Sequence, residues 1–221
     1  MMNEDSIIAK RPLGELIAEH LKQDIYNQKV KFGERLIEAD LAENFDVSRS
    51  TIREALKILE QEELVTSKAR KGTFVSEFTE RDLDEMNELR LMIEAKAFVK
   101  ALKNLEEPHY QDLQSIIDEM KEEAENGNWN ALFDLDMQFH QYVVNMCGNS
   151  RIIKIYESIS VQIRVYLAHL DQYYSSPVSF YREHKELMEA LLHKDTVSVE
   201  RKIKNHISFV EEKLVRKTDS E

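Results

Sequence analysis

Apolar side chains recur every three or four residues through most of this chain, and this spacing most narrows the folds that it can adopt. Such a period places the apolar side chains on one face of an α-helix. With only 5 glycines and 3 prolines in 221 residues, the chain has few points at which long helices would be interrupted. The sequence therefore predicts a mainly α-helical protein.

One short segment departs from the helical period. Residues 64–67 and 73–76 contain the β-branched and aromatic side chains typical of strands, and residues 69–72 between them include a glycine suited to a turn. This pattern predicts a small β-hairpin. Three helices are expected before it, at about residues 13–27, 36–44 and 49–62.

The helical period returns at Thr79 and continues toward the end of the chain. Breaks rich in Gly, Pro, Asn and Ser divide this part into at least six helices. We therefore expect two domains: a winged helix-turn-helix of three helices and a small β-hairpin over residues 1–78, and an all-helical bundle over residues 79–221.

The composition favours a cytoplasmic protein without a membrane segment. No apolar run approaches the ~20 residues needed to cross a bilayer, and the first residues are polar and acidic, unlike a signal peptide. The single cysteine, Cys147, cannot form an internal disulfide, as expected in a reducing compartment. Most of the net charge of −12 lies after residue 78, so this charge does not exclude DNA binding by the first domain.

Residues 41–56 have the pattern of a helix-turn-helix. Ala42 is small enough to let two helices touch, Val47 can close the turn, and the Ser48 hydroxyl can cap the second helix. The apolar face of that helix leaves polar side chains exposed on its first turns, where a recognition helix meets DNA. The predicted DNA contacts on this helix are Ser48, Arg49, Ser50, Thr51 and Arg53.

The turn of the β-hairpin is basic. Lys68, Arg70 and Lys71 can reach phosphates or the minor groove, so we assign Lys71 to the DNA interface. The alternative is a helical hairpin whose arginines only interact with solvent. The cap, the small residue, the arginine pair and the basic turn occur in the expected order, which favours binding to double-stranded DNA.

Four ionisable side chains of the helical part fall on apolar faces. Asp136 and His140 are four residues apart and therefore share a helix face, while His184 and His206 lie among apolar residues of two later helices. Three imidazoles and one carboxylate suit a divalent Zn, Ni or Mn ion, so we predict a metal site. Taken singly, each histidine could instead be an ordinary core or surface residue.

Two arginines are candidates for binding a small carboxylate effector. Arg90 lies between the apolar Met86 and Ile93, and Arg164 lies beside the apolar stripe of a later helix. A guanidinium group can bind a carboxylate through two parallel hydrogen bonds. Arg90 could equally extend to the surface or pair with Glu94.

The N-terminal motifs resemble those of the GntR family of bacterial regulators. The matching segments are residues 33–36, 47–56, 59–65 and 71–75. The resemblance implies that Arg49, Arg53 and Gly72 lie against operator DNA. The sequence departs from the family pattern at Asp46, where a turn glycine is common, and at Ala39, where some members carry an arginine that contacts DNA.

The C-terminal part resembles the ligand-binding domain of the FadR subfamily, often called FCD. Its metal-containing members have an Asp-x-x-x-His pair followed by two histidines on later helices, and Asp136, His140, His184 and His206 match this order. The resemblance implies a metal-bound small-acid sensor rather than an acyl-CoA sensor, with an effector contact at Arg90.

Together these patterns predict a homodimeric transcriptional repressor that binds a pseudo-palindromic operator and responds to a small organic acid held at the metal. The sequence leaves two alternatives open. One is a metal-dependent hydrolase with a DNA-binding appendage, and the other is a regulator whose metal is itself the signal or only structural. No clear general base accompanies the metal set, which favours a regulator over an enzyme.

Overall fold

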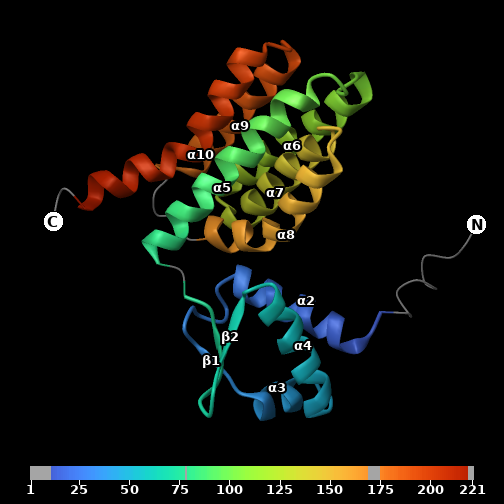
Figure 1. Cartoon of the computed structure of the whole chain (residues 1–221), viewed down its shortest axis with the longest axis vertical. Helices are drawn as coiled ribbons and strands as arrows, with labels where there is room; N and C mark the ends of the chain where they lie inside the picture. The colour runs from blue at the N-terminus through green and yellow to red at the C-terminus, as the bar shows by residue number, and fades with distance from the viewer. Residues whose placement is uncertain (1–10, 78, 169–174, 219–221) are drawn as a thin grey trace, which may run out of the picture. The chain divides into compact units, whose positions relative to one another are not determined.

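Two compact units divide the chain, one up to residue 78 and the other from Thr79 onward. The computed structural model describes residues 11–77, 79–168 and 175–218, and for residues 80 and 209–218 it describes the backbone alone. Among these residues, strands occur only in the first unit (Figure 1). No helix in the described ranges is both long and apolar enough to cross a membrane.

Within the described part of the N-terminal unit, residues 11–77, the chain forms three helices and a three-stranded antiparallel sheet. Along the chain they are α2 (Leu13–Tyr26), β1 (Arg35–Leu36), α3 (Glu38–Asn44), α4 (Arg49–Gln61), β2 (Val65–Lys68) and β3 (Gly72–Val75). Strand β3 lies between β1 and β2. The expected winged helix-turn-helix is thus confirmed. Its sheet has one strand more than predicted, because a two-residue strand has no detectable period.

Helices α2 and α4 pack together over the apolar faces that their spacing predicts. Ile17, Leu21 and Ile25 of α2 are buried, as are Ile52 and Leu59 of α4. Burying a side chain of this size contributes roughly 1.5–3 kcal/mol to stability. This packing fixes α4 on one side and leaves Arg49, Ser50 and Arg53 exposed on the other.

Six helices among the described residues form the C-terminal unit, an all-helical bundle. They are α5 (Glu80–Ala101), α6 (Glu107–Asn126), α7 (Trp129–Asn145), α8 (Ser150–Leu167), α9 (Pro177–Leu192) and α10 (Thr196–Thr218) (Figure 1). Helix α7 contacts α5, α6, α8 and α9, while α10 packs along α5 and α9. The inner faces of α5, α7, α9 and α10 are therefore brought together inside the bundle.

Local signals in the sequence set the ends of several of these helices. Thr79 and Asp82 form a capping box at the start of α5, with the Thr79 amide donating to Asp82 Oδ2 at 2.7 Å. Gly127 ends α6 with a φ of 72°, a conformation that favours glycine. Asn128 then caps α7 by accepting a hydrogen bond from the Ala131 amide at 3.3 Å. The Asn-Gly-Asn break therefore fixes where α7, the helix that carries Asp136 and His140, begins.

Candidate functional site

Helices α3 and α4 form the helix-turn-helix that the sequence predicts. The turn between them is closed by a hydrogen bond from the Val47 amide to the Ala42 carbonyl, 3.0 Å long. Asp46 adopts the left-handed conformation with a φ of 52°, which Asp tolerates better than most residues. The Ser48 hydroxyl caps α4 by accepting a hydrogen bond from the Thr51 amide at 3.2 Å. The first turn of α4 is therefore held by the residues that the motif singles out.

The other predicted contacts on α4 lie on its free side. Arg49, Ser50 and Arg53 are exposed, and Thr51 is half-buried. Arg53 Nε donates to Glu38 Oε2 of α3 at 2.8 Å. Since both side chains are solvent-exposed, this ion pair is weak and a DNA phosphate or base can compete for the guanidinium group.

The turn between β2 and β3 carries the remaining predicted DNA contacts. Lys71 and Gly72 are exposed there, and Gly72 has a φ of 107°. A Cβ atom at Gly72 would lie 3.0 Å from Arg35 Nε. Arg35 of β1 therefore lies against this turn and adds a basic side chain that the sequence analysis did not assign to the interface. The pairing of Arg35 with Phe74 of β3 is what brings it there.

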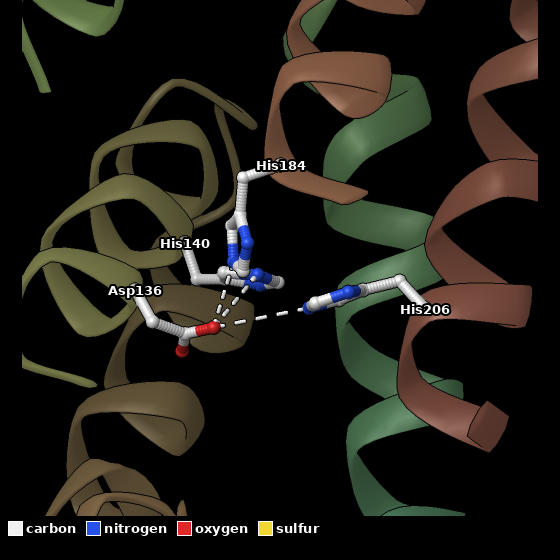
Figure 2. Close-up of side chains that lie close together, drawn as sticks. All are labelled: Asp136, His140, His184 and His206. Atoms are coloured by element: carbon white, nitrogen blue, oxygen red, sulfur yellow. Dashed lines mark hydrogen bonds and ion pairs between the residues drawn. The ribbon is translucent and has the colours of Figure 1, made fainter. Parts of the chain in front are cut away.

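The four residues of the predicted metal set lie together inside the bundle (Figure 2). Asp136 and His140 come from α7, His184 from α9 and His206 from α10. One ligand atom from each residue lies within 4.8 Å of those of all the others. All four residues are buried. The structure therefore brings the whole set to one place.

The Nε2 atoms of the three histidines point toward one carboxylate oxygen (Figure 2). Asp136 Oδ1 lies 2.8 Å from Nε2 of His184. The same oxygen lies 3.8 Å from Nε2 of His140 and 3.8 Å from Nε2 of His206. Four donor atoms thus surround one small volume, as in a site for a single cation.

Each imidazole ring of the cluster is also held through its other nitrogen, Nδ1. An acceptor at Nδ1 keeps the proton there and leaves the Nε2 lone pair available to a metal ion. The acceptors are Glu94 Oε2 for His140 at 2.5 Å, the Phe180 carbonyl for His184 at 3.0 Å and Glu183 Oε2 for His206 at 3.1 Å.

His184 makes the shortest contact of the cluster with Asp136. The Phe180 carbonyl can only accept, so Nδ1 of His184 carries a proton. Burial and the neighbouring His206 lower the pKa of His184, which favours the neutral ring. Its Nε2 atom faces Asp136, whose pKa lies well below its usual range because the three nearby histidines outweigh the effect of burial. At 2.8 Å, either a proton or a metal ion joins Nε2 to Asp136 Oδ1, so this contact suits a cation.

Other atoms of the cluster also fit a metal ion. His140 Nε2 and Asp136 Oδ2 are buried and have no hydrogen-bond partner among the described residues. Burial alone would lower the pKa of His206, but hydrogen bonds with Asp136 and Glu183 raise it to about 9, so this ring holds a proton that a metal ion would displace. Three imidazoles and a carboxylate are ligands that Zn, Ni and Mn accept. The residues present therefore fit a divalent ion.

A buried ion pair joins the metal cluster, as we call the four side chains of Asp136, His140, His184 and His206, to α5. Arg90 Nε donates to Glu94 Oε1 at 2.6 Å, and the other oxygen of Glu94 contacts His140. Burial would raise the pKa of Glu94, but Arg90 and His140 lower it to about 2. The ion pair that the sequence left open for Arg90 is therefore present. The contact of Glu94 with His140 was not predicted from the sequence, in which the spacing of four residues between Glu94 and Arg90 was the signal available.

Comparison with protein families gives two matches that together span most of the chain. Residues 85–209 match the FCD domain, and residues 13–75 match the bacterial regulatory proteins of the gntR family. The chain belongs to the GntR family and carries an FCD domain. This confirms the family expected from the motifs.

Relatives of this GntR protein are transcriptional regulators. The uncharacterized HTH-type transcriptional regulator YdhC of Bacillus subtilis is 27% identical over 85% of this chain and 84% of YdhC. The gluconate operon transcriptional repressor of Bacillus subtilis is 26% identical over 94% of this chain and 87% of the repressor. These relatives confirm the expectation of a regulator rather than an enzyme. The structure of Escherichia coli McbR/YncC has the same fold, with a TM-score of 0.77 and 22% identity over 93% of this chain and 98% of that chain.

Arg164, the second arginine considered for the effector, contacts another part of the FCD domain. Its Nε donates to Asp134 Oδ1 at 2.6 Å, and its Nη2 donates to the Asn130 carbonyl at 3.2 Å. The guanidinium group also lies over the Phe133 ring, 5.5 Å from its centre. All three partners belong to the first half of α7. These contacts favour a structural role for Arg164, joining α8 to α7, over the effector role.

A surface pocket of the FCD domain lies next to the metal cluster. Its volume is about 290 Å³, and it is lined by Glu183, Glu186, Arg201, Lys202, Asn205 and His206. Two of these residues, Glu183 and His206, form the hydrogen bond that orients one ring of the cluster. The pocket therefore brings solvent beside a predicted metal ligand.

Proposed function

We propose that this GntR-family protein is a repressor whose operator affinity is controlled by a small carboxylate bound at a divalent metal ion in the FCD domain. The observation that carries the proposal is the buried cluster, in which one ligand atom from each of its four residues lies within 4.8 Å of the others. The ion would be Zn, Ni or Mn, held by Asp136, His140, His184 and His206. If the bound ion accepts more ligands than these four, its remaining positions would be open to the effector.

Arg90 supplies the second anchor for the effector. Its Nε is engaged by Glu94, while its Nη2 is buried and has no hydrogen-bond partner among the described residues. A carboxylate oxygen would satisfy Nη2 with a charge-assisted hydrogen bond. The guanidinium group can therefore bind an anion without releasing Glu94.

The DNA-binding half of the proposal rests on α4 and on the wing, which is the hairpin formed by β2 and β3. Arg49, Arg53, Ser50 and Thr51 would meet base edges and phosphates in the major groove, with α4 capped by Ser48. Lys71 and Gly72 would approach the adjacent backbone or minor groove. The proposed DNA interface therefore consists of Ser48, Arg49, Ser50, Thr51, Arg53, Lys71 and Gly72.

A homodimer would place two such units on a pseudo-palindromic operator in the cytoplasm. Repression is supported by the relative that regulates the gluconate operon as a repressor. The effector can change operator affinity only by binding the free and the DNA-bound arrangements with different affinity. Typical coupling energies correspond to a change of about 5- to 150-fold.

The proposal is tested by operator titration of the full-length protein in four states: metal-free and metal-loaded, each with and without a small carboxylate. We expect the acid to change operator affinity only when the metal is present. A full response to the metal alone would make the metal the signal. An acid that binds tightly but leaves operator affinity unchanged would contradict the sensor function.

A substitution at Arg90 separates effector binding from metal binding. Arg90→Lys keeps a positive charge beside the buried Glu94, whereas Ala would leave that carboxylate without a partner. We expect Arg90→Lys to keep its metal and its operator affinity but to lose most of the response to the acid. Arg81→Lys is the matched control, because Arg81 lies on the same helix and pairs with Glu85 in solvent.

A further inference from the structure

Two buried polar side chains of the FCD domain have no hydrogen-bond partner among the described residues, and neither the proposed metal site nor the Arg90 anchor uses them. Asn87 is 1% exposed, and neither its amide nitrogen nor its amide oxygen has a hydrogen-bond partner among the described residues. Tyr156 is 0% exposed, and within the same residues its hydroxyl also has none. Buried polar groups in folded proteins are nearly always hydrogen-bonded, so these atoms indicate a place for a bound molecule.

Both side chains lie close to Arg90. Asn87 precedes Arg90 by three residues on α5 and therefore shares its helix face. Tyr156 belongs to α8, which packs against α5. Burial raises the pKa of Tyr156 well above its usual value, and the charges of Glu94, Arg90 and Asp136 also act on it. Tyr156 is therefore near both the buried ion pair and the metal cluster.

The unpaired amide oxygen of Asn87 differs in kind from the groups that bind a carboxylate. A carboxylate only accepts hydrogen bonds, so it can satisfy Arg90 Nη2 but not the amide oxygen of Asn87, which needs a donor. A hydroxyl group both donates and accepts, so it can bond to Asn87 and to Tyr156. An alkyl group at this place would leave both side chains buried and unpaired.

We propose that Asn87 and Tyr156 bind hydroxyl groups of a hydroxycarboxylic acid whose carboxylate lies at the metal ion and Arg90. This inference rests on the proposed function and narrows its effector from small carboxylates in general to hydroxylated ones. When no effector is bound, water would satisfy these polar groups. A hydroxyl group replaces that water with equivalent hydrogen bonds, whereas a methyl or methylene group does not.

The probes are three acids with the same three-carbon skeleton: propionate, lactate and glycerate, which carry no, one and two hydroxyl groups. Their binding to the metal-loaded, full-length protein is measured by isothermal titration calorimetry. We expect the affinity to rise with each hydroxyl group. The rise should be about tenfold for each hydrogen bond that is fully formed.

Lactate and glycerate can also gain affinity by chelating the metal through a hydroxyl group, so variants must identify the protein groups responsible. Asn87→Leu and Tyr156→Phe remove the polar atoms with little change of size. Each should reduce the preference for glycerate over propionate by about tenfold and leave the affinity for propionate unchanged. The matched control is Tyr142→Phe, since the Tyr142 hydroxyl donates to Asp112 at 2.6 Å on another pair of helices.

A merely structural role for Tyr156 gives a different result. Its hydroxyl makes no protein hydrogen bond among the described residues, so Tyr156→Phe should leave the melting temperature of the effector-free, metal-loaded protein unchanged or raise it. A lower melting temperature, together with equal loss of affinity for all three acids, would overturn the proposal.

The titrations also separate this inference from the function on which it rests. If none of the acids binds the metal-loaded wild type, the carboxylate-sensing function fails and the inference fails with it. If all three bind equally, or if both variants keep the wild-type preference for glycerate, hydroxyl recognition by Asn87 and Tyr156 is wrong while the carboxylate sensor stands.

Discussion

Glu183 and Glu186 are three residues apart on α9 and line the same pocket, but they have different partners. Glu183 Oε2 lies 3.1 Å from His206 Nδ1. Glu186 Oε2 instead accepts a hydrogen bond from Lys202 at 2.7 Å. Two chemically identical side chains therefore allow the effect of a ring-orienting contact to be compared with that of an ordinary surface ion pair.

We expect Glu183→Ala to lower metal affinity by about 10- to 100-fold, because the His206 ring loses the group that orients it and keeps its proton on Nδ1. Glu186→Ala should leave metal affinity close to that of the wild type. Competition with a chelator of known affinity measures both. Equal losses in the two variants would mean that the general charge of the pocket, rather than the His206 contact, determines metal binding.

For single residues, the sequence predicts a functional role where the position on a helix face is enough to identify it. Asp136 and His140 are found by their spacing of four and by the apolar stripe around them. Asn87 and Tyr156 could not be found in this way. These two residues stand out because their polar atoms remain unpaired after the helices pack. A helical period does not contain that information.

Among the elements, the proposed recognition helix α4 carries an ion pair that would have to open for Arg53 to bind DNA. Glu38 of α3 holds Arg53 of α4 at 2.8 Å. We expect Arg53→Ala to weaken operator binding by about 1–3 kcal/mol, as for loss of a base contact. Glu38→Gln should strengthen it, because the variant frees the guanidinium group and removes a negative charge near the phosphates. Fluorescence anisotropy with a labelled operator measures both changes, and a weaker Glu38→Gln complex would place Arg53 outside the interface.

The capping box at the start of α5 gives a prediction that depends on pH. Hydrogen bonds from Thr79 lower the pKa of Asp82, so their stabilisation is present above the ordinary pKa of Asp and is lost as the pH falls through the lowered value. Thr79→Ala should therefore reduce the free energy of unfolding by about 0.5–2 kcal/mol near neutral pH. The difference from the wild type should shrink in acid.

Urea unfolding at neutral and acidic pH provides the measurement for Thr79→Ala. Ser158→Ala serves as the control, because the Ser158 hydroxyl is exposed and donates to the Ile155 carbonyl within α8. Its loss should have little effect at either pH. A Thr79→Ala deficit of the same size at both pH values would show that the capping box does not depend on the Asp82 charge.

The elements themselves were largely predictable, and the exception has a physical cause. The second helix was expected from about residue 36, but α3 begins at Glu38, because Arg35 and Leu36 pair with β3. A strand of this length is created by its partner strand rather than by its own residues. Long helices of the bundle need no such partner to be recognised.

For the whole molecule, removal of the metal should destabilise the FCD domain. An ion that binds only the folded state stabilises it by about 2.7 kcal/mol when its concentration is 100 times its dissociation constant. We expect a chelator to lower the melting temperature of the wild type, and His206→Ala to abolish this effect. His109→Ala should keep it, since His109 Nδ1 accepts a hydrogen bond from the Glu106 amide. Calorimetry with and without chelator decides the matter, and a wild-type response in His206→Ala would rule out the four-residue site.

Glu94 contacts Arg90 through one carboxylate oxygen and His140 through the other. One side chain thus joins the proposed effector anchor to a predicted metal ligand, so a change in the charge at either end would be felt at the other. Linkage requires that the ion and the acid then alter each other's affinity by the same factor. We expect the proposed regulator to act as a logical AND: a cell starved of the metal would not respond to the acid, however abundant, and genes under this control would change only when both are present.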